Sequence, residues 1–208
     1  MDAALRELLG QIDLATQRLL DDARMLTEAD LRDPSLLPGW SRADVLAHTA
    51  LGADAMRNLL AAARTGQDRP ADASARTREA VAALSTADLV TYLADSAMAL
   101  RAVARQLPDE AWHVQLRVPG LAPFPAAEIA SRRLTEVELH HCDLGAGYGP
   151  ADWPDAFAAL ELAEPMRSQR QDRLGYPRTE RRAQARHQAP FRPGQRLPGS
   201  WIGQGGGR

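Results

Sequence analysis

Three side chains in this sequence have the types and the spacing that could hold a metal ion. Glu136 and His140 are one helical turn apart, and both fall in the apolar arc of the segment 126–144 rather than with its polar residues. A carboxylate and an imidazole in a core need a partner, because burying them bare is costly. A cation is one such partner. His48, on the apolar stripe of another predicted helix, is the natural third ligand.

Two histidines and one carboxylate are typical of a catalytic zinc site, and they also suit iron or other divalent ions. Spacing alone leaves a hydrogen-bonded polar core or a simple helix pair as alternatives. Glu138 and His141 form a competing pair, but the helical wheel places Glu138 on the exposed face and His141 at its border. Arg133 projects near Glu136 and His140, where it could serve the surface, orient the carboxylate or meet an anionic substrate.

Helices must position these residues, and the apolar periodicity predicts four substantial ones. The predicted helices span residues 2–23, 42–64, 89–106 and 126–144, with a last short helix at 153–164. Ser41 and Asp44 resemble a capping box at the start of the second helix, whose Asp54 should face water. We expect a loop at 65–74 and a short strand or extended connection at 112–118. The fold class is therefore all-α, a helix bundle.

Composition restricts the class of protein. A chain of 208 residues with 45% apolar residues predicts one soluble globular domain, and its start lacks the pattern of a signal peptide. We therefore expect a cytoplasmic protein without a membrane partner. Cys142 is the only cysteine, which excludes an internal disulfide and a zinc site built on several thiolates. Any metal must use histidine and carboxylate ligands, and Cys142 is expected to pack as a small hydrophobe.

The periodic pattern is lost from Pro165 onward. Residues 165–208 hold 10 Arg against 2 acids, whereas residues 1–164 hold 15 Arg against 25 acids. Arginine, glutamine, proline and glycine dominate this tail, which predicts disorder. Nucleic-acid binding through residues 167–186 is the alternative, but the segment lacks interleaved aromatic residues. We expect no nucleic-acid partner.

Two stretches also carry a resemblance. Residues 37–48 (LPGWSRADVLAH) and 132–153 (RRLTEVELHHCDLGAGYGPADW) resemble the signature segments of the mycothiol-dependent maleylpyruvate isomerase family, relatives of the DinB-like four-helix metalloproteins. The resemblance covers about residues 1–160 and implies a DinB-like bundle in a domain at 1–164. It also implies that His48, Glu136 and His140 are the metal ligands. These are the residues that the helical wheel singles out.

The resemblance implies a reaction as well. In that family the open metal position receives the thiol of mycothiol, and a divalent cation lowers the pKa of a bound thiol. The thiolate adds to the cis double bond of maleylpyruvate, the resulting single bond rotates, and loss of the thiol leaves fumarylpyruvate. A mycothiol S-transferase acting on another small-molecule electrophile is one alternative. Family members continue into a smaller mixed α/β domain that supplies an arginine, and residues 165–208 stand in its place. A non-catalytic metal-binding bundle is therefore a second alternative.

Overall fold

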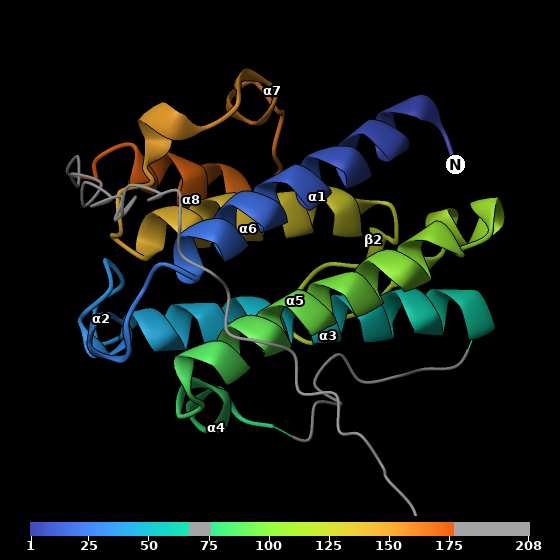
Figure 1. Cartoon of the computed structure of the whole chain (residues 1–208). Coiled ribbons are helices and arrows are strands. Elements are labelled where there is room, and N and C mark those ends of the chain that lie inside the picture. The colour runs from blue at the N-terminus through green and yellow to red at the C-terminus, as the bar shows by residue number, and fades with distance from the viewer. Residues whose placement is uncertain (67–75, 177–208) are drawn as a thin grey trace, which may run out of the picture.

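Four long helices dominate the computed structural model, which describes residues 1–66 and 76–176 (Figure 1). They are α1 (Ala3–Ala23), α3 (Arg42–Thr65), α5 (Thr86–Arg105) and α6 (Glu128–Asp143). Helices α1 and α3 each pack against both α5 and α6. This arrangement confirms the predicted all-α four-helix bundle. None of the described helices combines the length and the apolar character needed to cross a lipid bilayer.

Capping hydrogen bonds are present at the helix start that the sequence predicts and at one further helix. The Ser41 hydroxyl accepts a hydrogen bond from the Asp44 amide at 3.2 Å, and the Asp44 carboxylate accepts one from the Ser41 amide at 3.0 Å. The same reciprocal box is formed by Thr27 and Asp30 at the short helix α2 (Glu28–Arg32). These contacts satisfy amide groups that have no partner within the helix.

Short elements connect and extend the bundle. They are α4 (Arg78–Ala82), the 3-10 turns η1 (Asp109–His113) and η2 (Pro150–Asp152), the strands β1 (Gln115–Leu116) and β2 (Phe124–Pro125), and the helices α7 (Asp155–Ala158) and α8 (Met166–Arg173). The two strands pair antiparallel. The extended connection predicted at 112–118 is therefore present, but its first part belongs to η1. Most of the loop predicted at 65–74 lies outside the described residues.

The C-terminal part differs from the prediction in two places. The last helix, expected at 153–164, is reduced to the single turn of α7 at Asp155–Ala158. Disorder was predicted from Pro165 onward, yet residues 166–173 form α8, which packs against α6. The rest of the predicted disordered tail, 177–208, lies outside the described residues.

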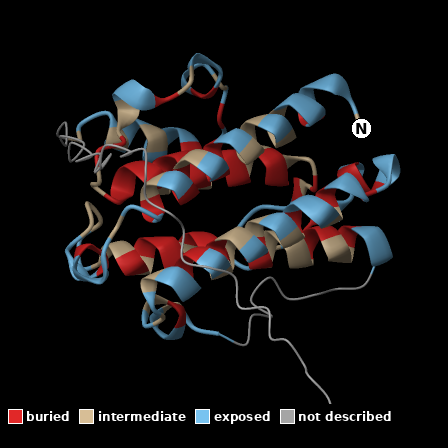
Figure 2. Cartoon of the chain, viewed as in Figure 1, coloured by how far each residue is buried: buried red, intermediate tan, exposed pale blue. Residues whose placement is uncertain are grey.

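The buried faces of the long helices point toward one another (Figure 2). Helix α6 is largely buried, because α1, α3 and α8 all pack against it. This enclosure overturns the prediction that Glu138 faces water: its exposed fraction is 1%. Asp54 was also expected to be exposed, but it is buried and accepts a hydrogen bond from the Tyr92 hydroxyl at 2.6 Å. A helical wheel assumes that the polar face of a helix is exposed to solvent, and it contains no information about other segments that cover that face.

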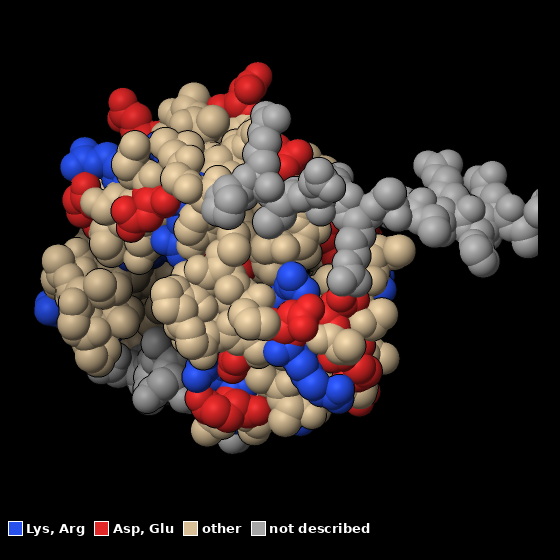
Figure 3. Space-filling view, turned by 90° about the vertical axis from the view of Figure 1, so that its left-hand side faces the viewer, with Lys and Arg blue, Asp and Glu red and all other residues tan. Residues whose placement is uncertain are grey.

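Charged side chains of both signs are interspersed on the end of the molecule that carries α2 (Figure 3). Several of them form ion pairs there, including Arg42 with Asp33 at 3.3 Å. The face in this view therefore carries mixed charge.

Candidate metal centre

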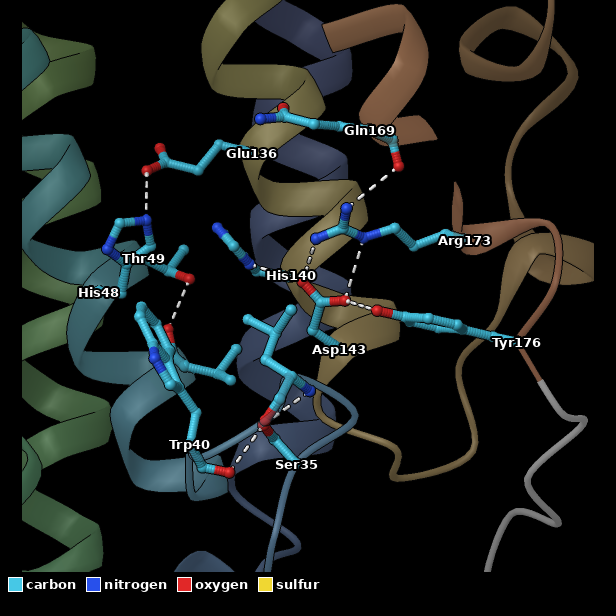
Figure 4. Close-up of polar contacts among 12 residues, drawn as sticks. Ser35, Trp40, His48, Thr49, Glu136, His140, Asp143, Gln169, Arg173 and Tyr176 are labelled. Atoms are coloured by element: carbon cyan, nitrogen blue, oxygen red, sulfur yellow. Dashed lines mark hydrogen bonds and ion pairs between the residues drawn. The ribbon is translucent and has the colours of Figure 1, made fainter. Parts of the chain in front are cut away.

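Contacts between the ends of α3 and α6 fix the two helices side by side. The amide of Leu36, in the connection before α3, donates a hydrogen bond to the Asp143 carbonyl at 2.8 Å. The Nε of Arg42, in the first turn of α3, donates to the Leu144 carbonyl at 2.8 Å. These bonds hold the start of α3 against the end of α6, so that His48 and His140 lie opposite each other (Figure 4).

The structure brings together all three predicted ligands. One donor atom from each of His48, Glu136 and His140 lies within 4.8 Å of the others. The Nε2 of His48 is 3.9 Å from the Oε1 of Glu136, and the two imidazole rings are nearly perpendicular with centroids 4.8 Å apart. Within residues 1–66 and 76–176 this is the one cluster of its kind.

The cluster lies at the open edge of the α3–α6 seam. The side chains of Glu136 and His140 are 13% and 15% exposed, whereas His48 is 44% exposed. His48 is therefore only partly buried, whereas the sequence predicts a buried residue in the apolar stripe of its helix. Its exposure leaves the cluster accessible to a small molecule.

The Glu136 carboxylate occupies the space that a side chain at Gly52 of α3 would fill. A Cβ atom on Gly52 would lie only 2.0 Å from the Oε1 of Glu136, so any side chain there would displace the carboxylate. The other oxygen, Oε2, accepts a hydrogen bond at 2.7 Å from the Nη1 of Arg133, which also donates to the Thr49 carbonyl at 2.7 Å. Arg133 is 1% exposed, which excludes the surface role considered for it. It orients the carboxylate so that Oε1 faces His48.

A second set of residues orients His140. Its Nδ1 lies 2.8 Å from the Oδ2 of Asp143, which is fully buried. Although burial raises the pKa of this carboxyl, hydrogen bonds from His140 and Arg173 lower it below its usual value. The ionised Asp143 carboxylate therefore accepts a hydrogen bond from the Nδ1–H of His140. The Nε2 of His140 is then a lone-pair donor, as in the carboxylate–histidine–metal arrangement.

Residues after the bundle complete this contact. Arg173 of α8 donates to Asp143 through Nε at 3.1 Å and Nη2 at 2.9 Å, and the Tyr176 hydroxyl donates at 2.9 Å (Figure 4). Sequence reasoning missed all three residues. The spacing of His140 and Asp143 could have indicated the carboxylate, but Arg173 and Tyr176 lie in a segment predicted to be disordered.

The environment of His48 favours its neutral form. Burial and the neighbouring His140 lower the pKa of His48. The edge of the Trp40 ring packs on the imidazole with centroids 5.3 Å apart, and the Arg78 guanidinium lies over Trp40 at 4.3 Å. A neutral imidazole is the form that binds a metal, so the donor set fits a divalent cation.

The competing pair on α6 is enclosed by protein partners. Glu138 accepts hydrogen bonds from the Nη2 of Arg18 at 2.6 Å and from the Tyr148 hydroxyl at 2.5 Å. His141 pairs through Nε2 with Asp22 at 2.9 Å and stacks on the Tyr148 ring at 3.7 Å. Burial and the bond to Glu138 raise the pKa of Tyr148, so the hydroxyl keeps its proton. This pair has the character of a structural network.

The single thiol is inert. Cys142 is fully buried within the main core cluster, and burial raises its pKa to about 12. The thiolate is the reactive form of cysteine, so this position has the properties of a small apolar side chain at neutral pH.

Known proteins of one family resemble this chain. The Mycothiol maleylpyruvate isomerase N-terminal domain family matches residues 12–145, which contain the three clustered residues. A crystal structure of the mycothiol-dependent maleylpyruvate isomerase is 29% identical with a TM-score of 0.68, and that of a mutant with a histidine replaced by alanine is 28% identical with a TM-score of 0.67. No curated protein is significantly similar in sequence.

The two structural matches cover only part of each chain. Each covers 74% of this chain and 65% of the solved chain, so this chain spans less than two thirds of the length of either relative. The family match covers the bundle from within α1 to the end of α6. It agrees with the predicted DinB-like architecture. The chain therefore belongs to the mycothiol-dependent maleylpyruvate isomerase family, through the family's N-terminal domain.

Proposed function

We propose that His48, Glu136 and His140 hold a divalent cation, zinc, and that the chain is a mycothiol-dependent isomerase that converts maleylpyruvate to fumarylpyruvate. The observation that carries this proposal is the convergence of two imidazoles and a carboxylate, within 4.8 Å, from two facing helices of the family's domain. Two histidines and one carboxylate are a common ligand set of catalytic zinc. The isomerase reaction is proposed by analogy with the related solved structure, which is a mycothiol-dependent maleylpyruvate isomerase.

The chain's own residues hold and orient this site. Arg133 fixes Glu136 with Oε1 toward His48, and Asp143 holds the Nδ1 proton of His140 so that Nε2 faces the cluster. Zinc, when bound, supplies a positive charge that lowers the pKa of a thiol beside it. The exposed edge at His48 leaves room for mycothiol to approach. The cis double bond of maleylpyruvate would become trans by reversible addition of that thiol, without a protein nucleophile.

Two parts of the chain have separate places in this proposal. In this proposal residues 1–164 are the metal-binding domain. Helix α8 supports the metal ligand His140 through Arg173 and Asp143. This contact favours a supporting role for the described start of the tail.

Metal analysis tests the site. The purified protein should contain about one equivalent of zinc, and His48→Ala should contain almost none. His113→Ala is the matched control, because His113 is exposed on η1 and outside the cluster. If His48→Ala retained the zinc content of the wild type, the site would be wrong.

Parallel assays test the reaction. Maleylpyruvate and a generic electrophile, each with mycothiol, should distinguish an isomerase from a mycothiol S-transferase, because both activities use the same thiol. Turnover of maleylpyruvate that is lost in His48→Ala supports the proposal. Zinc binding without either activity would instead support a non-catalytic metal-binding bundle.

A further inference from the structure

Helix α8 is held against the bundle by few side chains. Met166 is the one buried residue of this helix, and most of its other residues are exposed. Arg170 donates to the Phe157 carbonyl at 2.7 Å, which ties α8 to α7. One buried apolar side chain is a small anchor, so polar contacts have a large share in the docking of α8.

The polar contacts between this segment and α6 all end on one carboxylate. Arg173 and Tyr176 donate three hydrogen bonds to Asp143, whose side chain is 0% exposed. The fourth contact of the same carboxylate is with the Nδ1 of the candidate ligand His140. Figure 4 shows Asp143 between His140 and Arg173. The docking of α8 and the orientation of His140 therefore depend on a shared acceptor.

The four donors saturate this acceptor. The Oδ1 of Asp143 accepts from the Nε of Arg173 and the Tyr176 hydroxyl, and Oδ2 accepts from the Nη2 of Arg173 and the Nδ1 of His140. An ionised carboxylate has about four sites for donors, so each contact helps to fix the position of the others. Because Arg173 and His140 meet at the same oxygen, a change in the His140 ring alters the contact on which α8 depends.

Metal binding acts on this ring. A neutral imidazole can carry its proton on either nitrogen, whereas a cation bound at Nε2 leaves the proton on Nδ1, directed at Asp143. A bound cation therefore favours the geometry in which Asp143 meets Arg173. The Asp143 carboxylate lies between His140 and the Arg173 guanidinium, so its negative charge opposes their repulsion when a cation is bound.

We propose that residues 166–176 form a strap whose docking is coupled to metal occupancy. A divalent cation held by His48, Glu136 and His140 keeps the strap against α6, and the docked strap raises the affinity for the cation. Arg173 and Tyr176 are positioning residues, since they act on His140 through Asp143. Thermodynamic linkage makes the two effects equal in size. The inference rests on the proposed metal site, but not on the isomerase reaction.

Hydrogen exchange of the full chain, followed by mass spectrometry with and without zinc, tests the coupling. Zinc should slow the exchange of the amides of residues 166–176 by about tenfold, because a residue that supports a metal ligand is worth about 10–100-fold in metal affinity. His48→Ala should show the exchange of the zinc-free wild type whether or not zinc is added, since it removes a candidate ligand outside the strap.

Variants of the strap test the coupling from the other side. Arg173→Leu should remove the effect of zinc on the exchange, and Tyr176→Phe should reduce it, because only one of the donors to Asp143 is lost. Arg167→Leu is the matched control, since its partner Glu164 is exposed and outside the cluster. In Arg173→Leu the fold-loss of zinc affinity, measured by chelator competition, should equal the fold-loss of zinc-induced protection.

The outcomes separate the strap from the metal site. Zinc binding that leaves the exchange of residues 166–176 unchanged, or makes it faster, would overturn the coupling while the metal site stands. A chain that binds no zinc would overturn the metal site and the strap together. A zinc effect on the exchange that persists in Arg173→Leu would show that Asp143 does not transmit it, and the proposal would be rejected.

Discussion

Helix α6 carries two acid–histidine pairs within residues 136–141, Glu136 with His140 and Glu138 with His141. The fold gives the two pairs different surroundings. Glu138 and His141 pair with Arg18 and Asp22 of α1, and Tyr148, which follows α6, donates to Glu138. Of these two side chains only the Nδ1 of His141 is buried without a hydrogen-bond partner among the described residues. Their exposed fractions are 1% each.

Glu136 and His140 face α3, which offers a third candidate ligand and a glycine without a side chain instead of closing partners. His48 approaches Glu136 at 3.9 Å, and Gly52 leaves space for the carboxylate. The comparison teaches that residue type and helical spacing do not separate a ligand pair from a structural pair. The facing helix decides, because it either satisfies the polar groups or leaves their donor atoms directed at a shared point.

The largest expected difference between the pairs is in metal affinity. Glu136→Gln should lower zinc affinity by about 100-fold or more, because it removes a charged candidate ligand. Even the loss of a residue that only hydrogen-bonds to a metal ligand lowers metal affinity by about 10–100-fold. Glu138→Gln should leave the affinity nearly unchanged. Competition with a chromophoric chelator measures both constants. Equal losses in the two variants would remove the distinction between the pairs.

Stability should show the opposite order. His141→Ala should lower the free energy of unfolding by about 2–3 kcal/mol, because it opens a cavity beside Tyr148 and leaves Asp22 without this partner. His48→Ala should cost less than about 1 kcal/mol, since its side chain is 44% exposed. Urea denaturation of the zinc-free proteins gives both values. A larger loss in His48→Ala would contradict our assignment of roles.

The gap in α3 can be closed without touching a ligand. Gly52→Ala should lower zinc affinity by about tenfold or more, because its Cβ would displace the Glu136 carboxylate. Gly10→Ala is the matched control on α1, where a Cβ meets nothing within 4 Å. That control should raise stability by about 0.5–1 kcal/mol and leave zinc binding intact. Chelator competition and thermal unfolding test the two expectations, and wild-type zinc affinity in Gly52→Ala would show that the carboxylate tolerates displacement.

Loss of the α8 side chain that supports Asp143 should lower zinc affinity by a smaller factor. Arg173→Leu should reduce zinc affinity by about tenfold, because Asp143 then holds the His140 ring less firmly. Arg167→Leu, in the same helix, removes an exposed pair with Glu164 and should change nothing measurable. The same chelator titration compares them, and the expectation fails if the two variants bind zinc alike.

The smallest effect concerns the thiol of Cys142, which follows His141 on α6. Burial raises the pKa of Cys142 from 9.0 to about 12, so the folded protein should react very slowly with a thiol reagent at pH 8. The folded state holds this proton more tightly than the unfolded state. The resulting stability is complete below about pH 9 and is lost as the pH rises toward 12. Rapid labelling of the native protein at pH 8 would contradict the buried placement.

Local rules predicted the long helices and the convergence of His48, Glu136 and His140 well. Apolar residues at helical spacing and the Ser41–Asp44 box depend on neighbours in the chain, so they can be read without a structure. The same rules failed for Glu138 and Asp54, whose burial depends on Arg18 and Tyr92 from distant segments. They failed for Arg173 and Tyr176 because a charged, weakly periodic segment gives no sign of its docking partner.

By itself the sequence determined the helices, the absence of a thiolate zinc site, and the placing of Glu136 and His140 one turn apart, because these follow from residue identity and backbone period. Only the tertiary structure decided that His48 lies at an open edge and that Arg173 reaches Asp143. The physical reason is that burial and hydrogen-bond satisfaction are properties of neighbours in space, which helical period does not encode.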